Sequence, residues 1–413
     1  MNPFQLRGGA TPSGTMAYST YDICIRGSGI VGRTLALLLA RHRLRVGLVE
    51  SPAPASSLPD IRAYALNHRS QRLLAGLKCW PAPELATPVR EMRVTGDGGG
   101  HTRFEAEAMG EHAMTWIVDV PALEHMLQQA CQYQSGLDVL SADEAGRVRT
   151  ALTVVCEGKH SATRAELGVD YDVTPYRQTA IATRATLDAP HGGVAWQWFS
   201  HTGSMGEILA FLPLGGPQGQ EVAVVWSVDR ERVDDLLALD DDGFAAALQL
   251  ASHLQPEADG SSAAAATAVA PDVVSVARRM AWPLQLGLAR RWAGLRTAAE
   301  GKAAGSWVLA GDAAHSVHPL AGQGLNLGLA DAELLGALVG ERPYWRGPGD
   351  MHLLRQYERT RKAEIAPLVA GMDGIQQLFA HNSGAARQLR NLGLSLFDRS
   401  GPLKQFIARR AMG

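Results

Sequence analysis

The segment YDICIRGSGIVGRTLALLLARHRLRVGLVE, residues 21–50, constrains the fold of this chain more than any other stretch. Its pattern predicts a buried strand over 21–26, a helix with apolar spacing over 30–41 and a second strand over 45–49. Such a βαβ unit predicts an α/β fold with a Rossmann-like nucleotide-binding domain.

Three glycines and one acidic residue in this unit indicate dinucleotide binding. Gly27, Gly29 and Gly32 follow the first strand with G-x-G-x-x-G spacing. The first glycine permits the turn, the second lets the backbone approach a pyrophosphate, and the third allows helix and strand to pack closely. Glu50 ends the second strand and can accept hydrogen bonds from the ribose hydroxyls of FAD or NAD. This residue therefore does not distinguish an FAD site from an NAD site.

A second glycine-rich stretch, GDAAHSVHPLAGQGLNLGLADAELL, covers residues 311–335. The sequence predicts a strand over 306–310 and a helix that begins near Gly322 and Gly324. The free N–H groups of a helix N-terminus can stabilise a second electron-rich group. In an FAD site that group is the pyrimidine edge of the flavin, so the two stretches together favour FAD.

The motif G-D-A-A-H-x-x-x-P-x-x-G-Q-G-x-N at 311–326 resembles the class A flavoprotein monooxygenases, and among them the ubiquinone-biosynthesis hydroxylases. D-I-R-A at 60–63, W-I-V-D at 116–119 and L-x-x-Y-E-R-x-R-K at 354–362 extend the resemblance over nearly the whole chain from Tyr21 onward. The resemblance implies a glutathione-reductase-type FAD domain, an inserted antiparallel β-sheet substrate domain and a helical C-terminal region.

The implied reaction is hydroxylation of the aromatic ring of a polyprenylated phenol in ubiquinone biosynthesis. NADPH or NADH reduces FAD, O2 adds to the reduced flavin, and the resulting flavin hydroperoxide transfers one oxygen atom to the ring. The flavin carries the chemistry, so no side chain is nominated as a general base. Two alternatives stay open: a hydroxylase of a soluble phenol, and a catalytically weak FAD-binding scaffold subunit of a quinone-biosynthesis complex.

The resemblance also implies roles for individual residues. Asp312 would accept hydrogen bonds from the FAD ribitol, and His318 and Pro319 would lie beside the flavin. Arg62 would lie near the isoalloxazine or the phosphates, with a surface salt bridge as the alternative. The complete predicted FAD-binding set is Gly27, Ser28, Gly29, Ile30, Val31, Gly32, Glu50, Arg62, Glu157, Gly158, Gly311, Asp312, Pro319, Gly322, Gln323, Gly324, Leu325 and Asn326.

No metal site is predicted. His315 and His318 are three residues apart, but no carboxylate or cysteine cluster completes a ligand set around them. Packing or hydrogen bonding is the favoured role for both. The four cysteines lack C-x-x-C spacing, which favours reduced, buried thiols.

Residues 140–165 depart from the family pattern. Related hydroxylases have a longer β-meander and then A-D-G-x-x-S-x-x-R, whereas this chain has V-C-E-G-K-H-S-A-T-R at 155–164, with Glu157 at the usual Asp position. Residues 140–153 are too few for three ordinary strands and their turns. A shortened meander is therefore expected, which affects nicotinamide docking more than FAD binding.

Length and composition allow two or three domains with a large core, since the chain has 413 residues and is 46% hydrophobic. Its net charge of −2 gives no electrostatic reason to bind nucleic acid. We expect a disordered extension at residues 1–20, with Met16 as an alternative start of the chain. The FAD-binding domain is expected at 21–80, 100–165 and 280–345, and the substrate domain at 81–99 and 166–279. A helical region is expected at 346–413.

Five aromatic residues fall in the predicted sheet region. Packing in the sheet core is favoured over an aromatic pocket for Trp196, Trp198, Phe199, Phe211 and Trp226.

The C-terminal segment bears on the partners of the chain. Basic residues predominate over 387–413, which suits an anionic lipid surface, a protein complex or a solvated helix face. No apolar run is long enough to span a bilayer, so we expect a cytoplasmic protein with at most peripheral contact at the inner membrane face.

Overall fold

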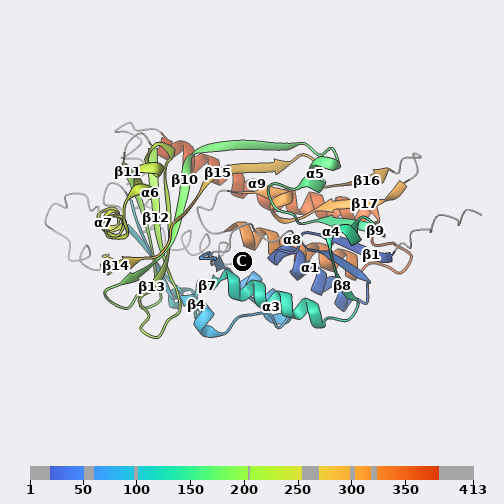
Figure 1. Cartoon of the computed structure of the whole chain (residues 1–413), viewed down its shortest axis with the longest axis horizontal. Coiled ribbons are helices and arrows are strands. Elements are labelled where there is room, and N and C mark those ends of the chain that lie inside the picture. The colour runs from blue at the N-terminus through green and yellow to red at the C-terminus, as the bar shows by residue number, and fades with distance from the viewer. Residues whose placement is uncertain are drawn as a thin grey trace, which may run out of the picture.

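The computed structural model describes residues 19–50, 60–96, 101–202, 205–253, 269–297, 303–317 and 323–380. Two large sheets lie at opposite ends of the molecule, and a long helix, α9 (Met351–Ala380), runs along one side between them (Figure 1). This mixed α/β architecture confirms the predicted fold class. In the part of the chain that is described, no helix is long and apolar enough to cross a membrane.

The first sheet has six strands in the order β16-β17-β9-β1-β2-β8. All neighbours are parallel except β16 and β17. The strands are β1 (Ser19–Arg26), β2 (Val46–Val49), β8 (Leu137–Leu140), β9 (Val148–Val155), β16 (Ala293–Thr297) and β17 (Ala303–Leu309). The βαβ unit predicted over 21–50 is confirmed, because α1 (Ile30–Arg41) connects the adjacent parallel strands β1 and β2.

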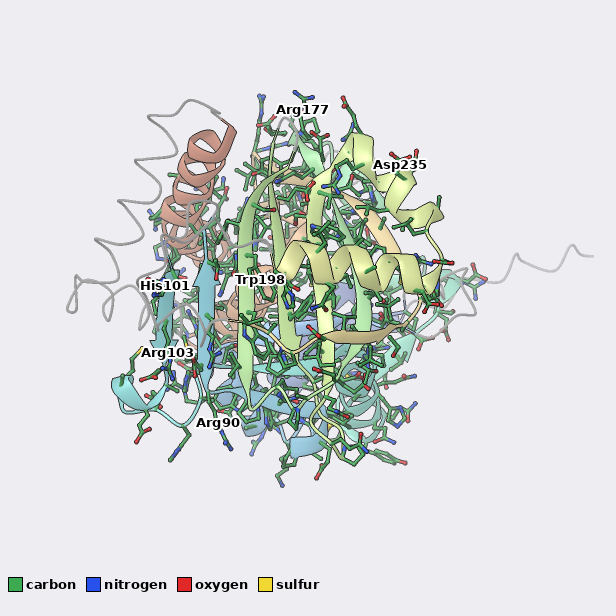
Figure 2. The ribbon with its side chains drawn as sticks, turned by 90° about the vertical axis from the view of Figure 1, so that its left-hand side faces the viewer. Arg90, His101, Arg103, Arg177, Trp198 and Asp235 are labelled. Carbon is green, nitrogen blue, oxygen red and sulfur yellow. The ribbon has the colours of Figure 1, made fainter. Side chains whose placement is uncertain are left out.

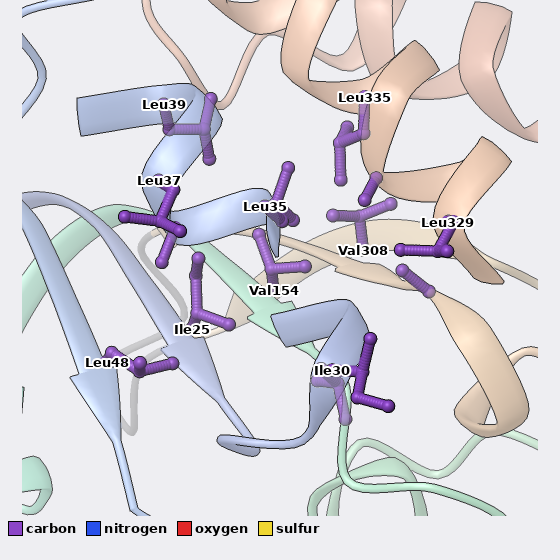
Figure 3. Close-up of a cluster of buried hydrophobic side chains, with 14 of the residues drawn as sticks. Ile25, Ile30, Leu35, Leu37, Leu39, Leu48, Val154, Val308, Leu329 and Leu335 are labelled. Carbon is purple, nitrogen blue, oxygen red and sulfur yellow. The ribbon is translucent and has the colours of Figure 1, made fainter. Parts of the chain in front are cut away.

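Helix α1 packs between this sheet and α8 (Gln323–Gly340), while α3 (Val120–Tyr133) also contacts α1. Figure 3 shows Leu35 of α1, Val154 of β9 and Leu335 of α8 in one cluster, and all three are 0% exposed. Gly328 and Gly336 of α8 allow the close approach, because a Cβ at these positions would lie 2.7 Å from Val31 and 3.2 Å from Leu38. The core therefore fixes α8 against the N-terminal βαβ unit.

The second sheet has the strand order β18-β15-β10-β13-β12-β11-β5-β6, with β14 also paired to β10. It is antiparallel apart from the β5–β11 pair, which confirms the inserted antiparallel β-sheet that the family resemblance implied. Its strands are β5 (Glu91–Thr95), β6 (His101–Glu105), β10 (Tyr171–Leu187), β11 (Val194–Thr202), β12 (Met205–Pro213), β13 (Glu221–Asp229), β14 (Val273–Val276), β15 (Met280–Ala289) and β18 (His315–Ser316).

Strand pairing differs from the expected domain division at two boundaries. We placed residues 101–105 and 280–289 with the nucleotide-binding domain. Strand β6 instead pairs with β5, and β15 pairs with β10, so both belong to the nine-stranded sheet. The partner of each strand comes from another segment of the chain, so a local sequence pattern does not reveal the pairing.

The outer face of the nine-stranded sheet is covered by α6 (Val233–Ala238) and α7 (Asp241–Ser252). Figure 2 shows α7 lying across this face, near the labelled Trp198. Trp196, Trp198, Phe211 and Trp226 are buried in one cluster with Phe244 of α7. Packing in the sheet core, the favoured interpretation, is therefore confirmed for these four side chains, while Phe199 lies outside the cluster.

A three-stranded sheet, β3-β7-β4, packs against the inner face of the large sheet. It consists of β3 (Ala63–Leu66), β4 (Ala86–Val89) and β7 (Thr115–Asp119), with α2 (His68–Gly76) after β3. Val89 and Ile117 of this sheet are buried against Ala195 and Ala223. Single turns complete the described elements: η1 (Pro83–Leu85), η2 (Glu107–Met109), η3 (Arg230–Arg232), η5 (Gly311–Ala313), α4 (Ala142–Ala145) and α5 (Ala162–Glu166).

The connection between β8 and β9 is as short as predicted. It contains the single turn α4, and no strand lies between Leu140 and Val148. Ser141 and Glu144 form a capping box at the start of this turn, which satisfies its first N–H groups locally. One capped turn thus connects β8 to β9.

Phe244→Ala is expected to lower the free energy of unfolding by about 3–5 kcal/mol, because it removes a fully buried ring from the contact between α7 and the sheet. Leu250→Ala is the matched control on the same helix, where the side chain is 68% exposed, and should change stability by about 0.5 kcal/mol or less. Urea unfolding of both variants measures the difference. Equal losses would contradict the packing described for α7.

Candidate active site

The turn after β1 requires glycine at two positions because of the protein's own packing. Gly27 has φ of 108°, and a Cβ there would lie 2.4 Å from the carbonyl oxygen of Cys156. A Cβ on Gly32 would lie 1.9 Å from the carbonyl oxygen of Gly27. Gly29 differs, because a Cβ there would meet no atom within 4 Å. The middle glycine thus faces open space, as expected where a ligand approaches the backbone.

The first turn of α1 is suited to bind an anion. Gly29 is the N-cap, no side chain caps the turn, and the turn contains no acidic residue. Its N–H groups and the positive end of the helix dipole are therefore available to a pyrophosphate. Ser28 and Ile30 are buried in this turn, while Val31 packs against Gly311 and Gly328.

Glu50 and Arg62 are two further predicted residues that the structure describes. Glu50 follows β2 and is exposed, with its N–H donating to the carbonyl of Leu140 at 2.9 Å. Arg62 donates from Nε and Nη2 to the Asp60 carboxylate at 2.6–2.9 Å, and its Nη2 lies 3.8 Å from Glu124. The ion pair with Asp60 agrees with the salt-bridge alternative for Arg62, whose side chain remains 40% exposed.

Glu157 contacts the start of the short helix α5, whose N-cap is Ser161. Its carboxylate accepts hydrogen bonds from the Ser161 hydroxyl at 2.7 Å, the Thr163 hydroxyl at 2.7 Å and the Thr163 N–H at 3.0 Å. Burial alone would raise the pKa of Glu157, but these hydrogen bonds outweigh it and lower the pKa. Gly158, the next residue, has φ of 78°, so it permits the turn that brings the carboxylate to its partners.

Arg164 and Tyr171 hold the backbone of η5 from one side. The Arg164 guanidinium donates to the carbonyl of Ala313 at 3.1 Å and lies 3.6 Å from the centre of the Tyr171 ring. The Tyr171 hydroxyl donates to the carbonyl of Asp312 at 3.1 Å. These contacts join the segment after β9 to the segment after β17, although about 150 residues separate them in the chain.

Asp312, which was predicted to contact the FAD ribitol, has an accessible side chain. Its side chain is exposed at the turn after β17, and Gly311 before it has φ of 62°. Many protein atoms nevertheless surround the carboxyl group, and this desolvation raises the pKa of Asp312. An accessible acceptor on a fixed turn can receive hydrogen bonds from ribitol hydroxyls.

Asp331 of α8 holds the same turn from the other side, and sequence reasoning did not select it. Its Oδ2 accepts from the Gly311 N–H at 2.8 Å and lies 2.6 Å from His315 Nε2, while its Oδ1 accepts from Arg361 Nε at 2.6 Å. Asp331, His315 and Arg361 are each at most 1% exposed. The available signal was the spacing of Asp331, which lies four residues before Leu335 and therefore on the same, apolar face of the helix. A carboxylate on an apolar face indicates a buried ion pair.

His315 has a hydrogen-bonding and packing role, as favoured from the sequence. Its imidazole also stacks on Trp292, with the ring centres 5.1 Å apart. Burial alone would raise the pKa of Asp331, but the charges and hydrogen bonds of His315 and Arg361 outweigh it and lower the pKa. Among the described residues, no group of three metal-ligating side chains lies close enough to hold an ion.

Helix α8 begins at Gln323, and a Cβ on Gly324 would meet no atom within 4 Å, while Leu325 packs against the core. Asn326 joins this helix to β3 and α2. Its Oδ1 accepts from the Asn67 N–H at 3.0 Å and the Ser70 hydroxyl at 2.7 Å, and its Nδ2 donates to the carbonyl of Ala65 at 2.8 Å. His318, Pro319 and Gly322 lie outside the described residues.

Comparison with known proteins assigns a class to this fold and site. Residues 123–371, more than half of the chain, match the family described as FAD binding domain. The chain belongs to this family and is an FAD-dependent monooxygenase of class A. The predicted cofactor is thereby confirmed, and the unobstructed Gly29, the uncapped α1 and the accessible Asp312 fit FAD.

Particular relatives cover nearly the whole chain. Ubiquinone hydroxylase UbiL of Rhodospirillum rubrum is 29% identical, with 99% of this chain and 94% of the relative aligned. The 3-demethoxyubiquinol 3-hydroxylase of Escherichia coli is also 29% identical, with 95% and 98% aligned. Among solved structures, p-nitrophenol 4-monooxygenase PnpA of Pseudomonas putida shares the fold, with a TM-score of 0.67, 16% identity, and 95% and 98% of the two chains covered.

Gly29→Ala is expected to weaken FAD binding at least about tenfold, because the added methyl group would occupy the space left for the pyrophosphate. The FAD-free protein should keep its thermal unfolding temperature, since no protein atom lies within 4 Å of that methyl group. Gly76→Ala, also free of contacts within 4 Å, is the control and should change neither property. Fluorescence titration with FAD and thermal unfolding measure both. Unchanged FAD affinity in Gly29→Ala would contradict this placement of the phosphates.

Glu157→Gln is expected to lower the free energy of unfolding by about 1–3 kcal/mol at neutral pH, because the ionised carboxylate accepts three hydrogen bonds. The folded-state pKa is below the unfolded one, so this contribution is complete above the ordinary Glu pKa of about 4.3. It is lost as the pH falls through the folded-state pKa. Urea unfolding from pH 7 to pH 3 should show the two proteins converging. Glu166→Gln, at an exposed position of the same helix, is the control, and a pH-independent difference for Glu157→Gln would refute the account.

Proposed function

We propose that this monooxygenase hydroxylates the aromatic ring of a polyprenylated phenol in ubiquinone biosynthesis. The observation that carries the proposal is the end-to-end similarity to relatives named for ubiquinone hydroxylation, which aligns 95–99% of the chain. When bound, FAD supplies the redox chemistry: NAD(P)H reduces it, and it then activates O2 for transfer of one oxygen atom. The residues of this chain bind the cofactor, orient the phenol and exclude water.

The predicted FAD-binding residues have distinct places in this proposal. The turn at Gly27–Gly32 and the first turn of α1 hold the pyrophosphate, and Glu50 accepts from the ribose. Asp312 accepts from the ribitol, and the first turn of α8, with Gly324, faces the flavin. Glu157, Gly158 and Asn326 act indirectly, because their contacts shape the adjacent protein segments.

The inner face of the nine-stranded sheet supports an apolar aromatic substrate. Strand register aligns Gln197, Ala210, Val225 and Ala182 in one row across β11, β12, β13 and β10. Ala182, Ala210 and Val225 have short side chains on this face, whereas Trp196, Trp198, Phe211 and Trp226 lie on the outer face. Val225 also packs in one cluster with Val317, two residues beyond His315. The phenol ring binds on this face, opposite the segment that carries Asp312.

Access to a lipid-soluble substrate belongs to the same proposal. Gln197, Phe199, Ile208, Ala210 and Val225 remain partly exposed on the inner face, so apolar surface is available there. A prenyl chain gains free energy by burial on such a surface. Peripheral contact with a membrane or with a biosynthetic complex would deliver this substrate, and the basic segment predicted for that contact, 387–413, lies outside the described residues.

The test is anaerobic stopped-flow reduction of the holoprotein by NADPH or NADH, with a prenylated phenol, the same phenol without its chain, or neither. The prenylated phenol is expected to accelerate loss of oxidised-flavin absorbance and, in air, to yield hydroxylated product. Faster reduction by the unprenylated phenol alone would favour a hydroxylase of soluble phenols. Flavin that stays oxidised with every phenol would favour an FAD-binding scaffold.

Ala210→Phe tests the proposed substrate face within the same assay. The larger side chain should raise the KM for the prenylated phenol at least about tenfold while FAD affinity stays constant. Val274→Phe is the matched control, because Val274 lies on β14 and is 61% exposed. Equal effects of the two substitutions on KM would contradict this placement of the phenol.

A further inference from the structure

A single carboxylate oxygen holds both ends of the turn that carries Asp312. Asp331 Oδ2 accepts from the N–H of Gly311, the residue before Asp312, at 2.8 Å. The same oxygen lies 2.6 Å from Nε2 of His315, three residues after Asp312. Asp331 is 0% exposed, so water does not compete for these hydrogen bonds. The position of the Asp312 carboxylate thus depends on a buried group that has no direct access to the ligand.

Arg361 on α9 forms a buried ion pair with Asp331. Its Nε donates to Asp331 Oδ1 at 2.6 Å, its Nη2 donates to the carbonyl of Leu327 at 3.0 Å, and its Nη1 pairs with Glu364. One turn earlier, the Tyr357 hydroxyl donates to the carbonyl of Leu309 at the end of β17. Helix α9 is therefore anchored to both the strand and the helix that border the Asp312 turn.

We propose that Asp331 is a positioning residue for FAD and that Arg361 is its obligatory partner. The pair fixes the backbone of residues 311–315 before the cofactor arrives, so that Asp312 already faces the ribitol. A turn fixed in advance binds more tightly, because less conformational entropy is lost when the ligand is bound. This inference rests on FAD binding alone and does not depend on which phenol is hydroxylated.

A purely structural role for the pair makes a different prediction. Removing one charge leaves the other buried without a partner and destabilises the fold whatever the pair does for FAD. Replacing both by apolar residues of similar size often preserves stability. The double variant Asp331→Leu/Arg361→Met therefore separates positioning from folding, because it removes the acceptor for Gly311 and His315 without leaving a buried unpaired charge.

The experiment measures the Kd for FAD, by fluorescence titration of the FAD-free protein, together with its thermal unfolding temperature and the midpoint potential of bound flavin. The double variant is expected to unfold within a few degrees of the parent, to bind FAD at least about tenfold more weakly, and to shift the midpoint potential. Arg361→Lys, which retains a cation, should remain closer to the parent in FAD affinity than Arg361→Met. Parental affinity in the double variant would overturn the proposal.

The control is Asp172→Asn/Arg290→Met, which neutralises an exposed ion pair between β10 and the residue after β15. Arg290 Nε lies 3.0 Å from Asp172 Oδ2, the two side chains are 64% and 59% exposed, and neither side chain contacts residues 311–315, Asp331 or Arg361 through a described ion pair or hydrogen bond. This variant should keep the FAD affinity and flavin potential of the parent. If it weakens FAD binding as much as the double variant of Asp331 and Arg361, or if the latter loses its fold, positioning by the buried pair is refuted.

Discussion

The site depends on how closely the backbone after β1 approaches the backbone after β9. Gly27 faces the carbonyl of Cys156 at a distance that excludes even a methyl group. This contact places the glycine turn beside the segment that contains Glu157 and Arg164, and β17 ends at the same edge of the sheet. Segments far apart in the sequence therefore converge at the carboxyl ends of parallel strands, where ligands of such sheets bind.

Directional hydrogen bonds then fix the turn that carries Asp312. Tyr171 and Arg164 hold its carbonyl groups, while Asp331 holds the N–H that precedes it. Each of these side chains comes from a different element, so the turn is defined by the packing of β10, α5 and α8 together. Buried, directional hydrogen bonds favour one conformation, which suits a turn that is proposed to present a carboxylate to a cofactor.

The two faces of the nine-stranded sheet carry different side chains. Side chains alternate along each strand, so large aromatic rings on one face are compatible with short side chains on the other. The outer face packs Trp226 and Phe211 beneath α7 and forms a core of its own. The inner face, with Ala210 and Val225, is directed toward Val317 and α9. The stable outer face can thus support the inner face on which we propose that the phenol binds.

The sequence by itself determined the elements whose signals are local: the βαβ unit from Ser19 to Val49, the glycine turn, the shortened connection before β9 and the helix that begins at Gln323. Apolar periodicity and turn chemistry act between near neighbours, so they can be read from one stretch of chain. Only the tertiary structure decided that Asn326 joins two helices, that β15 belongs to the second sheet and that Arg361 neutralises Asp331. Buried polar partners are chosen by which elements pack together, because a charge removed from water is stabilised by whatever group the fold brings to it.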